Sequence, residues 1–420
     1  MKKFCLLVAV VIVLALGVSA CGTPTETATK PPVGETTAPS TEAATNEPTA
    51  AEVTPASKSE ILIGNLQDES GGMKALSIAC TYAATMQVEK INAAGGINGH
   101  PIKLITYDTR SDVNEAINAY HRLVEQDKVP VVFGPPIANI GIALAPVAEE
   151  LKVPIVGLFM DDKATIQENG EPWHYMYLVQ NSAPVQGKIM AQYGLQDLKA
   201  KTAAILYISQ NSYSVGMAIP FEEVFTAGGG QIIDKETYTS ADKDFRPQLT
   251  KIKAANPDII YFPSYPVEIP LIYTQAYELG ITVPMLGSNS VLPTGLAPQT
   301  DPAATTNTYF PYGINPTEPE LVAFAQEYKA KFGIDPVAQA YSGYDAFGVL
   351  VQAISVCGEE ITSECINKQL NNIKDFQGFQ GSITISPETH QPVPLPMAIM
   401  TIKEGKPEFV KWYTPEGPLQ

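Results

Sequence analysis

Hydrophobic residues form two patterns along the chain, short continuous runs and repeats every three or four positions, and segments of the two kinds alternate. Short apolar runs such as 60–66 (EILIGNL) and 102–108 (IKLITYD) are typical of buried strands, whereas residues 74–94 repeat apolar side chains every three or four positions, as an amphipathic helix does. The pattern predicts strands over residues 60–66, 102–108, 129–133, 153–158, 202–208, 231–238, 258–262 and 283–286, and helices over residues 74–94, 112–126, 138–151, 184–196, 215–227, 245–255 and 267–279. Further helices are predicted near residues 318–332, 340–357 and 363–373, with short strands after them.

The order of these elements predicts the fold class. Strands that alternate with helices form a parallel sheet covered on both faces. The alternation runs once before residue 181 and again after it, so we expect an α/β protein with two similar Rossmann-like lobes, each with a central, mainly parallel sheet. Ligands of open α/β sheets bind beyond the carboxyl ends of the strands, so two such sheets that face each other predict a cleft between the lobes.

The segment 89–108, EKINAAGGINGHPIKLITYD, joins the first predicted helix to the second strand. Gly95 or Gly96 can adopt the left-handed conformation that ends a helix, and Asn98-Gly99 favours a tight turn. Pro101 suits the first position of a strand, where a missing N–H matters least. The glycines therefore predict a structural turn, and because they follow a helix rather than a strand they do not fit the dinucleotide-binding pattern.

The first residues have the features of an export signal. Lys2 and Lys3 precede an apolar run, 4–18, which ends in the small residues of VSAC. We expect a secretory signal peptide over residues 1–20. The cysteine directly after the small residues resembles the lipobox of bacterial lipoproteins, and this resemblance implies that Cys21 carries a diacylglycerol. An ordinary signal peptide with a chance cysteine and an uncleaved membrane anchor are the alternatives.

Residues 22–57 consist mainly of Thr, Pro, Glu and Ala and contain no aromatic residue. Such a segment cannot bury enough apolar surface to offset the entropy lost on ordering. We expect residues 21–58 to be the lipidated cysteine and a disordered tether, partly stiffened by proline.

Charge and composition exclude several classes of function. The chain of 420 residues has a formal net charge of -17, which argues against nucleic acid as a partner because phosphates are bound by clustered Lys and Arg. The sequence has no HExxH, paired-cysteine or GxSxG pattern. We expect no cofactor, no metal and no enzyme activity. The histidines are scattered, and we expect each at the surface or in a turn: His100, His121, His174 and His390.

The cysteines of the folded region have different predicted roles. Cys80 falls on the apolar side of the first predicted helix, which favours core packing. Cys357 and Cys365 flank a short loop, and in an exported protein a disulfide between them is expected to contribute roughly 2–3 kcal/mol. Two unpaired thiols are the alternative.

Four segments in order resemble the leucine/isoleucine/valine-binding protein family, the type I periplasmic binding proteins that feed ABC importers. They are EKINAAGGINGHPIKLITYD, DFRPQLTKIKAANPDIIYF, AYSGYDAFGVLVQAI and FQGFQGSITIS, and the resemblance extends from about residue 60 to residue 412. It implies two lobes joined by a multi-crossing hinge. We expect residues 59–181 with 315–390 in the N-terminal lobe and residues 182–314 with 391–420 in the C-terminal lobe. It also implies a monomer that delivers a small-molecule solute to ABC permease and ATPase subunits.

The resemblance also implies ligand-binding positions at the strand ends. The matching turns are FGPPIANIG and GLFMDD in the first lobe and SQNSYSVG, FPSYPVE and LGSNSV in the second. These turns contain the candidate ligand-binding residues Ala138, Asn139, Phe159, Met160, Asp161, Tyr213, Tyr265 and Asn289.

Two of these positions depart from the family pattern. Ala138 stands where a hydroxyl is usual, and Asn289 stands where an acid usually binds the ligand's ammonium group. Asn289 can still donate and accept hydrogen bonds, and Asp161 could replace the acid from the opposite lobe. Core packing is the alternative role for Phe159 and Met160. The residues thus support small-molecule binding more than they support a branched-chain amino acid.

The sequence predicts an extracytoplasmic, lipid-anchored solute-binding protein of an ABC importer, which closes two lobes over a small amino-acid-like or amide-type solute. A ligand-sensing receptor component that signals occupancy to a membrane partner is the alternative from another class. An enzyme ranks third, because no nucleophile and base pair was found.

Overall fold

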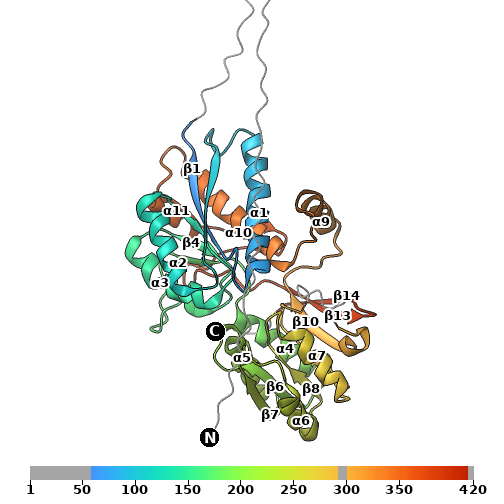
Figure 1. Ribbon diagram of the computed structural model, residues 1–420. Coiled ribbons are helices and arrows are strands. Elements are labelled where there is room, and N and C mark those ends of the chain that lie inside the picture. Colours follow the sequence, from blue (N-terminus) through green and yellow to red (C-terminus); the bar gives the residue numbers. More distant parts are fainter. Residues whose placement is uncertain (1–57, 292–299, 415–420) are drawn as a thin grey trace, which may run out of the picture. The chain divides into compact units, whose positions relative to one another are not determined.

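The computed structural model describes residues 58–291 and 300–414 (Figure 1). The predicted signal peptide, the Cys21 lipidation site and the tether up to residue 57 lie outside the described residues. Contacts join Ala56–Gln420 into one compact unit. Within the described part of the chain, no helix is both long enough and apolar enough to cross a membrane.

A five-stranded sheet forms the centre of the N-terminal lobe. All of its strands are parallel, in the order β2-β1-β3-β4-β5, and Ile61 pairs with Ile102 at the start of the register. The strands are β1 (Ile61–Gln67), β2 (Ile102–Asp108), β3 (Val132–Phe133), β4 (Ile155–Gly157) and β5 (Met176–Leu178).

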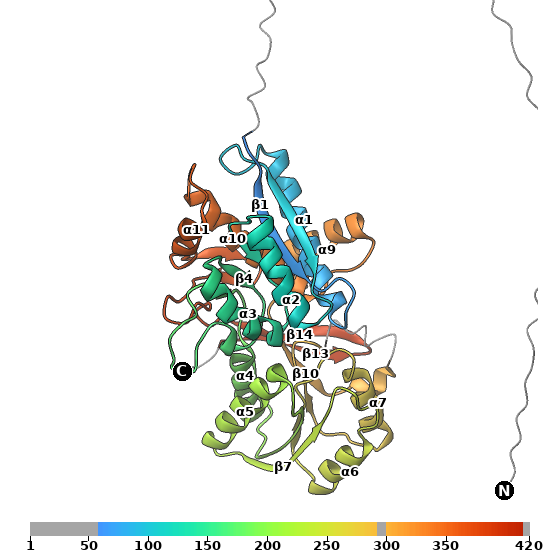
Figure 2. The same cartoon turned by 60° about the vertical axis from the view of Figure 1, so that its left-hand side comes forward.

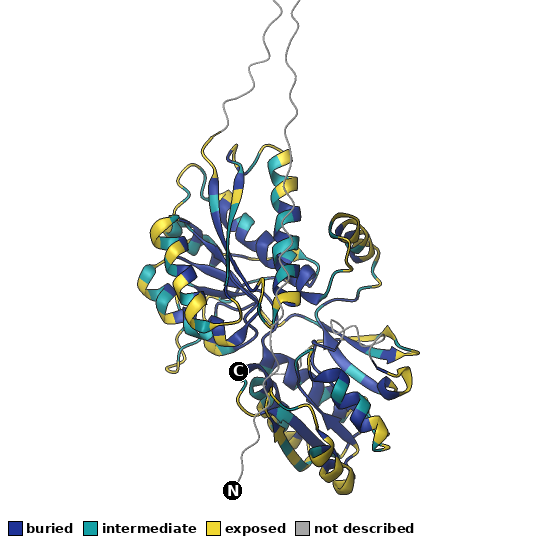
Figure 3. Ribbon diagram, in the orientation of Figure 1, coloured by how far each residue is buried: buried dark blue, intermediate teal, exposed yellow. Residues whose placement is uncertain are grey.

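Helices cover both faces of this sheet. Consecutive residues of β3 show the arrangement, because Val132 packs with α2 and α3 while Phe133 packs with α1 and α10. Figure 3 shows the strands buried and the outer faces of these helices exposed. The helices of the lobe are α1 (Lys74–Ala93), α2 (Val113–His121), the π-helical turn η1 (Arg122–Gln126), α3 (Ala138–Leu151), η2 (Asp162–Ala164), α10 (Ala338–Val356) and α11 (Ser363–Leu370).

A seven-stranded sheet forms the centre of the C-terminal lobe, in the order β14-β13-β10-β9-β8-β6-β7. The last five strands are parallel, and β13 and β14 are antiparallel at one edge, so the predicted mainly parallel sheets are confirmed. The strands are β6 (Thr202–Ile208), β7 (Gln231–Tyr238), β8 (Ile259–Tyr261), β9 (Met285–Leu286), β10 (Thr308–Tyr312), β13 (Met397–Lys403) and β14 (Lys406–Tyr413).

Two helix pairs pack on this second sheet, α4 and α5 on one face and α6 and α7 on the other (Figures 1 and 2). They are α4 (Ala183–Gln196), α5 (Ser212–Ala227), α6 (Arg246–Ala255) and α7 (Ile269–Glu278), with the short turn η4 (Pro302–Thr305). Helix α9 (Pro319–Phe332) and the hairpin of β11 (Phe376–Gly378) and β12 (Gly381–Ile383) complete the described elements.

The chain passes between the two sheets three times, after β5, after β10 and before β13. Asn181 joins the first crossing to the third. Its Nδ2 donates to the Leu395 carbonyl at 2.7 Å, and its Oδ1 accepts the Leu395 N–H at 2.9 Å. The crossings form the predicted multi-segment hinge. The lobe boundaries at residues 181, 314 and 390 remain a prediction, because the contacts between residues join both lobes into one compact unit.

The turn after α1 takes the predicted form. Gly95, Gly96 and Gly99 all have positive φ angles, and the Gly96 N–H donates to the Ile91 carbonyl at 2.9 Å. A Cβ atom on Gly96 would lie 2.2 Å from the carbonyl oxygen of His100, so the turn requires glycine at this position.

His390 has one of the two locations expected for the histidines, a turn, and does not have the other, the surface. His390 lies in a turn, but it is only 3% exposed, its ring stacks on Tyr177 at 4.4 Å, and its Nδ1 lies 3.2 Å from the Met176 carbonyl. Burial lowers the pKa of His390 to about 4, so the ring is neutral at physiological pH. His100 is buried as well.

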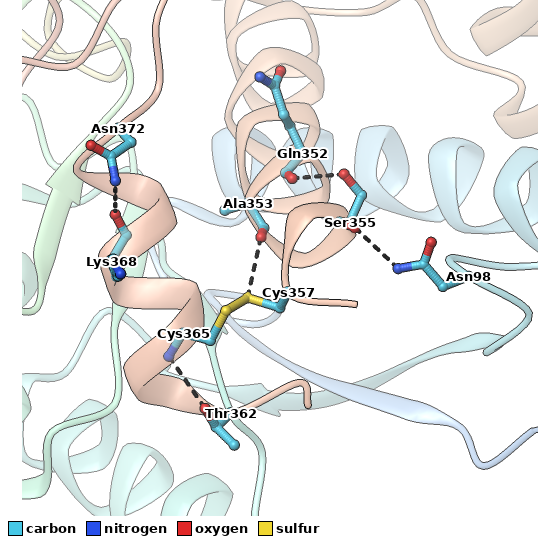
Figure 4. Close-up of a disulfide and its surroundings, with 9 residues drawn as sticks. All are labelled: Asn98, Gln352, Ala353, Ser355, Cys357, Thr362, Cys365, Lys368 and Asn372. Carbon is cyan, nitrogen blue, oxygen red and sulfur yellow. Dashed lines mark hydrogen bonds between the residues drawn. A yellow bond between two sulfur atoms is a disulfide. The ribbon is translucent and has the colours of Figure 1, made fainter. Parts of the chain in front are cut away.

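The described cysteines lie in two places. Cys80 is fully buried in the core between α1 and α10, and burial raises the pKa of its thiol. Cys357 and Cys365 form a disulfide with their Cα atoms 5.9 Å apart, which joins the end of α10 to the first turn of α11 (Figure 4).

Candidate functional site

The turn after β4 brings the N-terminal lobe into contact with the C-terminal lobe. Ala138 at the start of α3 and Met160 in this turn are buried in the same cluster as Tyr213 and Met217 of α5. Met160 has a φ angle of +64°, uncommon for a large side chain, and its carbonyl accepts the Ala183 N–H at 2.6 Å. Two of the predicted positions thus pack between the lobes as apolar contacts.

Phe159 lies elsewhere, inside the core of the N-terminal lobe. Its side chain is fully buried with the residues of α2 and α3. Cβ atoms built on Gly134, Gly141 and Gly157 would come within 2.8, 2.5 and 2.5 Å of neighbouring atoms, and the Phe159 ring is the closest neighbour of the last two. The ring occupies space that these glycines leave free, so the structure separates Phe159 from the other predicted ligand-binding residues.

Asp161, two residues further on, belongs to the contact between the lobes. Its side chain is 5% exposed, and its Oδ1 accepts the Lys163 N–H at 3.0 Å, which caps the turn η2. Burial raises the pKa of Asp161, and the bonds from Lys163 and from the hydroxyl of Ser212 offset this rise only in part. The carboxylate therefore sits in a site that favours an additional hydrogen-bond donor or a positive charge.

Asn139 and Ser212 form a polar contact between α3 and α5. The Ser212 hydroxyl donates to Asn139 Oδ1 at 2.7 Å and also lies within reach of the Asp161 carboxylate. One hydroxyl has a single proton, so it cannot donate to both acceptors at once. Rotation of the Asn139 amide, with its N–H toward Ser212, would satisfy all three groups.

Tyr213, Tyr265 and Asn289 lie together in the C-terminal lobe. The rings of Tyr213 and Tyr265 stack with centroids 4.8 Å apart, and the Tyr213 hydroxyl donates to Asn289 Oδ1 at 2.6 Å. Burial raises the pKa of Tyr265, and the nearby charge of Asp161 adds to this effect. The stacked pair therefore has Asp161 near Tyr265 and Asn289 in contact with Tyr213.

The structure adds three residues that the sequence did not suggest. Ser212 starts α5 and reaches the other lobe, and the Ser290 hydroxyl lies 3.2 Å from that of Tyr213. Glu268 is 3% exposed, and burial raises the pKa of its carboxyl group. Glu268 ends the turn FPSYPVE, from which we selected only Tyr265 on the basis of the sequence. The presence of an acidic residue in that turn could have identified Glu268.

The assembled site can bind but has no catalytic arrangement that we recognise. It combines the two buried carboxyl groups of Asp161 and Glu268, two carboxamides, hydroxyl groups and a pair of stacked aromatic rings, which together suit a small organic molecule with polar ends. Among residues 58–291 and 300–414, no group of three or more His, Cys, Asp or Glu side chains is placed to hold a metal ion.

Comparison with known proteins identifies the family. The model of the family described as periplasmic binding protein matches residues 60–407. The Leu/Ile/Val-binding protein homolog 3 of Brucella melitensis is 26% identical over 335 residues, which are 79% of this chain and 88% of the relative.

Two solved structures are similar over the same region. Leucine binding protein LivK from Thermotoga maritima and the branched-chain amino acid transporter substrate-binding protein LivJ from Streptococcus pneumoniae are each 29% identical to this chain. Each comparison covers 84% of this chain and 99% of the other, with TM-scores of 0.76 and 0.74. This chain therefore belongs to the leucine/isoleucine/valine-binding family of periplasmic binding proteins, which bind solutes outside the cytoplasm and are not enzymes.

Proposed function

We propose that this protein is the lipid-anchored solute receptor of an ABC importer and closes its two lobes over a small amino-acid-like or amide-type solute. The family supports delivery of the solute to permease and ATPase subunits. The names of its relatives refer to leucine, isoleucine and valine, and one similar structure is described in complex with isoleucine. Those names support a small amino-acid-like ligand here.

The observation that carries the proposal is the buried carboxylate of Asp161 at the contact between the lobes. The two groups that donate hydrogen bonds to it, the Lys163 N–H and the Ser212 hydroxyl, are neutral, and although the Lys163 charge also favours the ionised form, burial keeps the pKa of Asp161 raised. A carboxylate buried in this way is stabilised by a cation or an N–H donor, which an amine or amide of the ligand would provide. The Tyr213 and Tyr265 rings would pack against the apolar part of that ligand.

The most direct test is mass spectrometry of small molecules released when the purified protein is denatured. Calorimetry with leucine, aromatic amino acids, amides and polyamines then measures their affinities. Asp161→Ala should weaken binding by about 2–5 kcal/mol, the range for a buried charge that loses its partner. Asn289→Ala should weaken it by about 1–3 kcal/mol, the range for a neutral hydrogen bond.

Two further variants sharpen this test. Asp161→Asn keeps an oxygen that can accept the Lys163 N–H but removes the charge, so it separates the ligand contact from the cap of η2. Asp162→Ala removes a neighbouring carboxylate that lies outside the proposed contact, and it should change the affinity much less. Tight leucine binding that neither Asp161 variant nor Asn289→Ala alters would show that the site is misplaced.

The membrane anchor is proposed from the sequence around Cys21. Thioether attachment of a lipid requires the thiol, so Cys21→Ser should release the protein from membranes into the medium. Cell fractionation with an immunoblot for the protein measures this. A variant that is processed and still remains on the membrane would contradict the lipoprotein proposal.

A further inference from the structure

The three crossings between the lobes meet around a small cavity of ≈ 20 Å³. A cavity of this size holds about one water molecule or one small polar group. The lining residues come from all three crossings, from α4 and α10, from the turn after β9 and from the turn between β11 and β12, and none of them is ionisable: Gln180, Asn181, Gln186, Asn289, Gly313, Ala338, Ser342, Gln380, Leu395, Pro396 and Met397.

Most of the carboxamides around the cavity are held by the backbone. Both ends of the Asn181 amide form hydrogen bonds with the backbone of Leu395, and Gln180 Nε2 donates to the Leu158 carbonyl at 2.9 Å. Gln380 Nε2 donates to the Val179 carbonyl at 3.1 Å. These bonds fix the side chains in place, so the wall of the cavity is preorganised.

Gln186 is the exception, because one of its polar atoms lacks a partner. The residue is 1% exposed, and its Nε2 donates to the Asn181 carbonyl at 3.3 Å. That carbonyl determines the orientation of the amide, since the reverse orientation would place two acceptors against each other. Gln186 Oε1 is then a buried acceptor without a hydrogen bond from any described residue. A buried acceptor left in this way is costly unless a donor reaches it.

The cavity adjoins the candidate site at Asn289. Asn289 lines the cavity, and its Oδ1 accepts the hydroxyl of Tyr213, which stacks on Tyr265 near Asp161. A ligand that packs on the two rings with one end near Asp161 can therefore direct its other end toward Gln186.

The chemistry of the walls selects the group that would enter. A charged group would lose its hydration without gaining an opposite charge from the lining, and an apolar group would leave Gln186 Oε1 unpaired. An uncharged N–H or O–H donor, such as the NH₂ end of a primary amide or a hydroxyl, pairs with this acceptor, and its donor atom takes the space of one water.

We propose that this hinge cavity is a subsite for an uncharged hydrogen-bond donor at the far end of the ligand. The ligand class is then an amine with a primary amide or hydroxyl at its other end, rather than an amine with a hydrocarbon end. This inference rests on the proposed function, because it assigns the second end of the solute held at Asp161.

The test compares pairs of ligands with the same shape that differ only in the donor. Suitable pairs are glutamine with methionine, asparagine with leucine, and 4-aminobutan-1-ol with pentylamine, measured by calorimetry. The wild-type protein should bind the donor-bearing member of at least one pair roughly tenfold more tightly, as expected for a buried acceptor that gains its partner. Gln186→Met keeps the side-chain volume and removes the acceptor. The affinities of the two ligands of a pair should then differ by no more than about twofold.

A second variant reduces the volume of the hinge cavity and leaves the acceptor Gln186 Oε1 in place. A Cβ atom on Gly313 would lie 3.4 Å from Gln380 Oε1, an ordinary contact, so Gly313→Ala should fold and narrow the cavity. It should weaken binding of the donor-bearing ligand about as much as Gln186→Met does. Gln196→Met, at the far end of α4, makes the same substitution outside the cavity and should keep the wild-type ratio.

The outcomes separate the two proposals. If both members of a pair bind and the ratio is near one, or is unchanged in both cavity variants, the cavity holds only water, and the subsite is refuted while solute binding stands. If no member of any pair binds to the wild-type protein, both the subsite and the amino-acid-like ligand are refuted.

Discussion

Replacing Asp345 by asparagine should change how the stability of this protein depends on pH. Asp345 lies on α10 and is 1% exposed. Its Oδ1 accepts the Phe379 N–H at 2.8 Å, and its Oδ2 accepts the Gln380 N–H at 2.9 Å and Gln380 Nε2 at 3.2 Å. These bonds attach the turn between β11 and β12 to α10, beside the hinge cavity.

The magnitude follows from the pKa. Burial raises the pKa of Asp345 from 3.8 to about 7, although the bonds from Gln380 and Phe379 favour the charged form. The folded protein therefore holds a proton here that the unfolded chain releases between these two values. Stability from this group is complete below pH 3.8 and is lost as the pH rises through about 7. At about 1.4 kcal/mol for each pH unit, the loss is at most about 4 kcal/mol.

The asparagine variant removes this titration. The asparagine side chain places an amide N–H against backbone N–H donors, and this lowers the free energy of unfolding by an amount that does not depend on pH. Only the pH dependence of the difference in unfolding free energy between wild type and Asp345→Asn therefore reports on the carboxyl group. Urea unfolding followed by circular dichroism between about pH 4 and pH 8 gives the free energies. Wild type should lose stability relative to Asp345→Asn as the pH rises. Asp375→Asn in the same hairpin controls for the loss of an exposed carboxylate.

A flat difference between wild type and Asp345→Asn would show that the three N–H donors balance the cost of burial. A difference that grows in favour of wild type with rising pH would show that they outweigh it. Either result would refute the reasoning that desolvation dominates at this position.

Two other predictions concern the core and the disulfide. The mature, unreduced protein should show one reactive thiol after unfolding, that of Cys80, because Cys357 and Cys365 are bridged; labelling of three thiols would contradict the bridge. Gly141→Ala should lower the free energy of unfolding by about 1–3 kcal/mol, because the added methyl would approach the Phe159 ring to 2.5 Å, and thermal unfolding followed by circular dichroism measures this loss.

The glycine prediction has a matched control in the same lobe. A Cβ atom on Gly72 would meet its nearest neighbour, Ser111 Oγ, only at 4.0 Å, so Gly72→Ala should have little effect. Equal stability of the two alanine variants would show that the ring of Phe159 can move aside.

Much of the fold was predictable because the periodic segments are long. The predicted strands 102–108, 202–208 and 231–238 and the helix 138–151 agree with β2, β6, β7 and α3 at both ends. Two strands were missed. They are β5 and β10, and β10 contains Pro311, which local reasoning takes as evidence against a strand. Pairing with neighbouring strands, not local preference, makes these segments strands.

The candidate site was predictable in part. Asp161, Tyr213, Tyr265 and Asn289, four of the candidate residues, lie near one another in the structure, while their role in ligand binding stays a prediction. Ser212 and Gln186 were not found, because a serine at the start of a helix and a glutamine within one are common and carry no spacing signal.

By itself, the sequence determined the alternation of strands and helices, the two lobes and the turns that hold the candidate ligand-binding residues. It could not distinguish Phe159 from Asp161, which lie two residues apart in the same turn. Only the tertiary structure decided where their side chains lie, because three glycines from separate segments leave the space that holds the Phe159 ring, while Asp161 lies near Ser212 of the other lobe. Contacts between residues far apart in sequence depend on how the elements pack, and periodicity within one segment has no information about that packing.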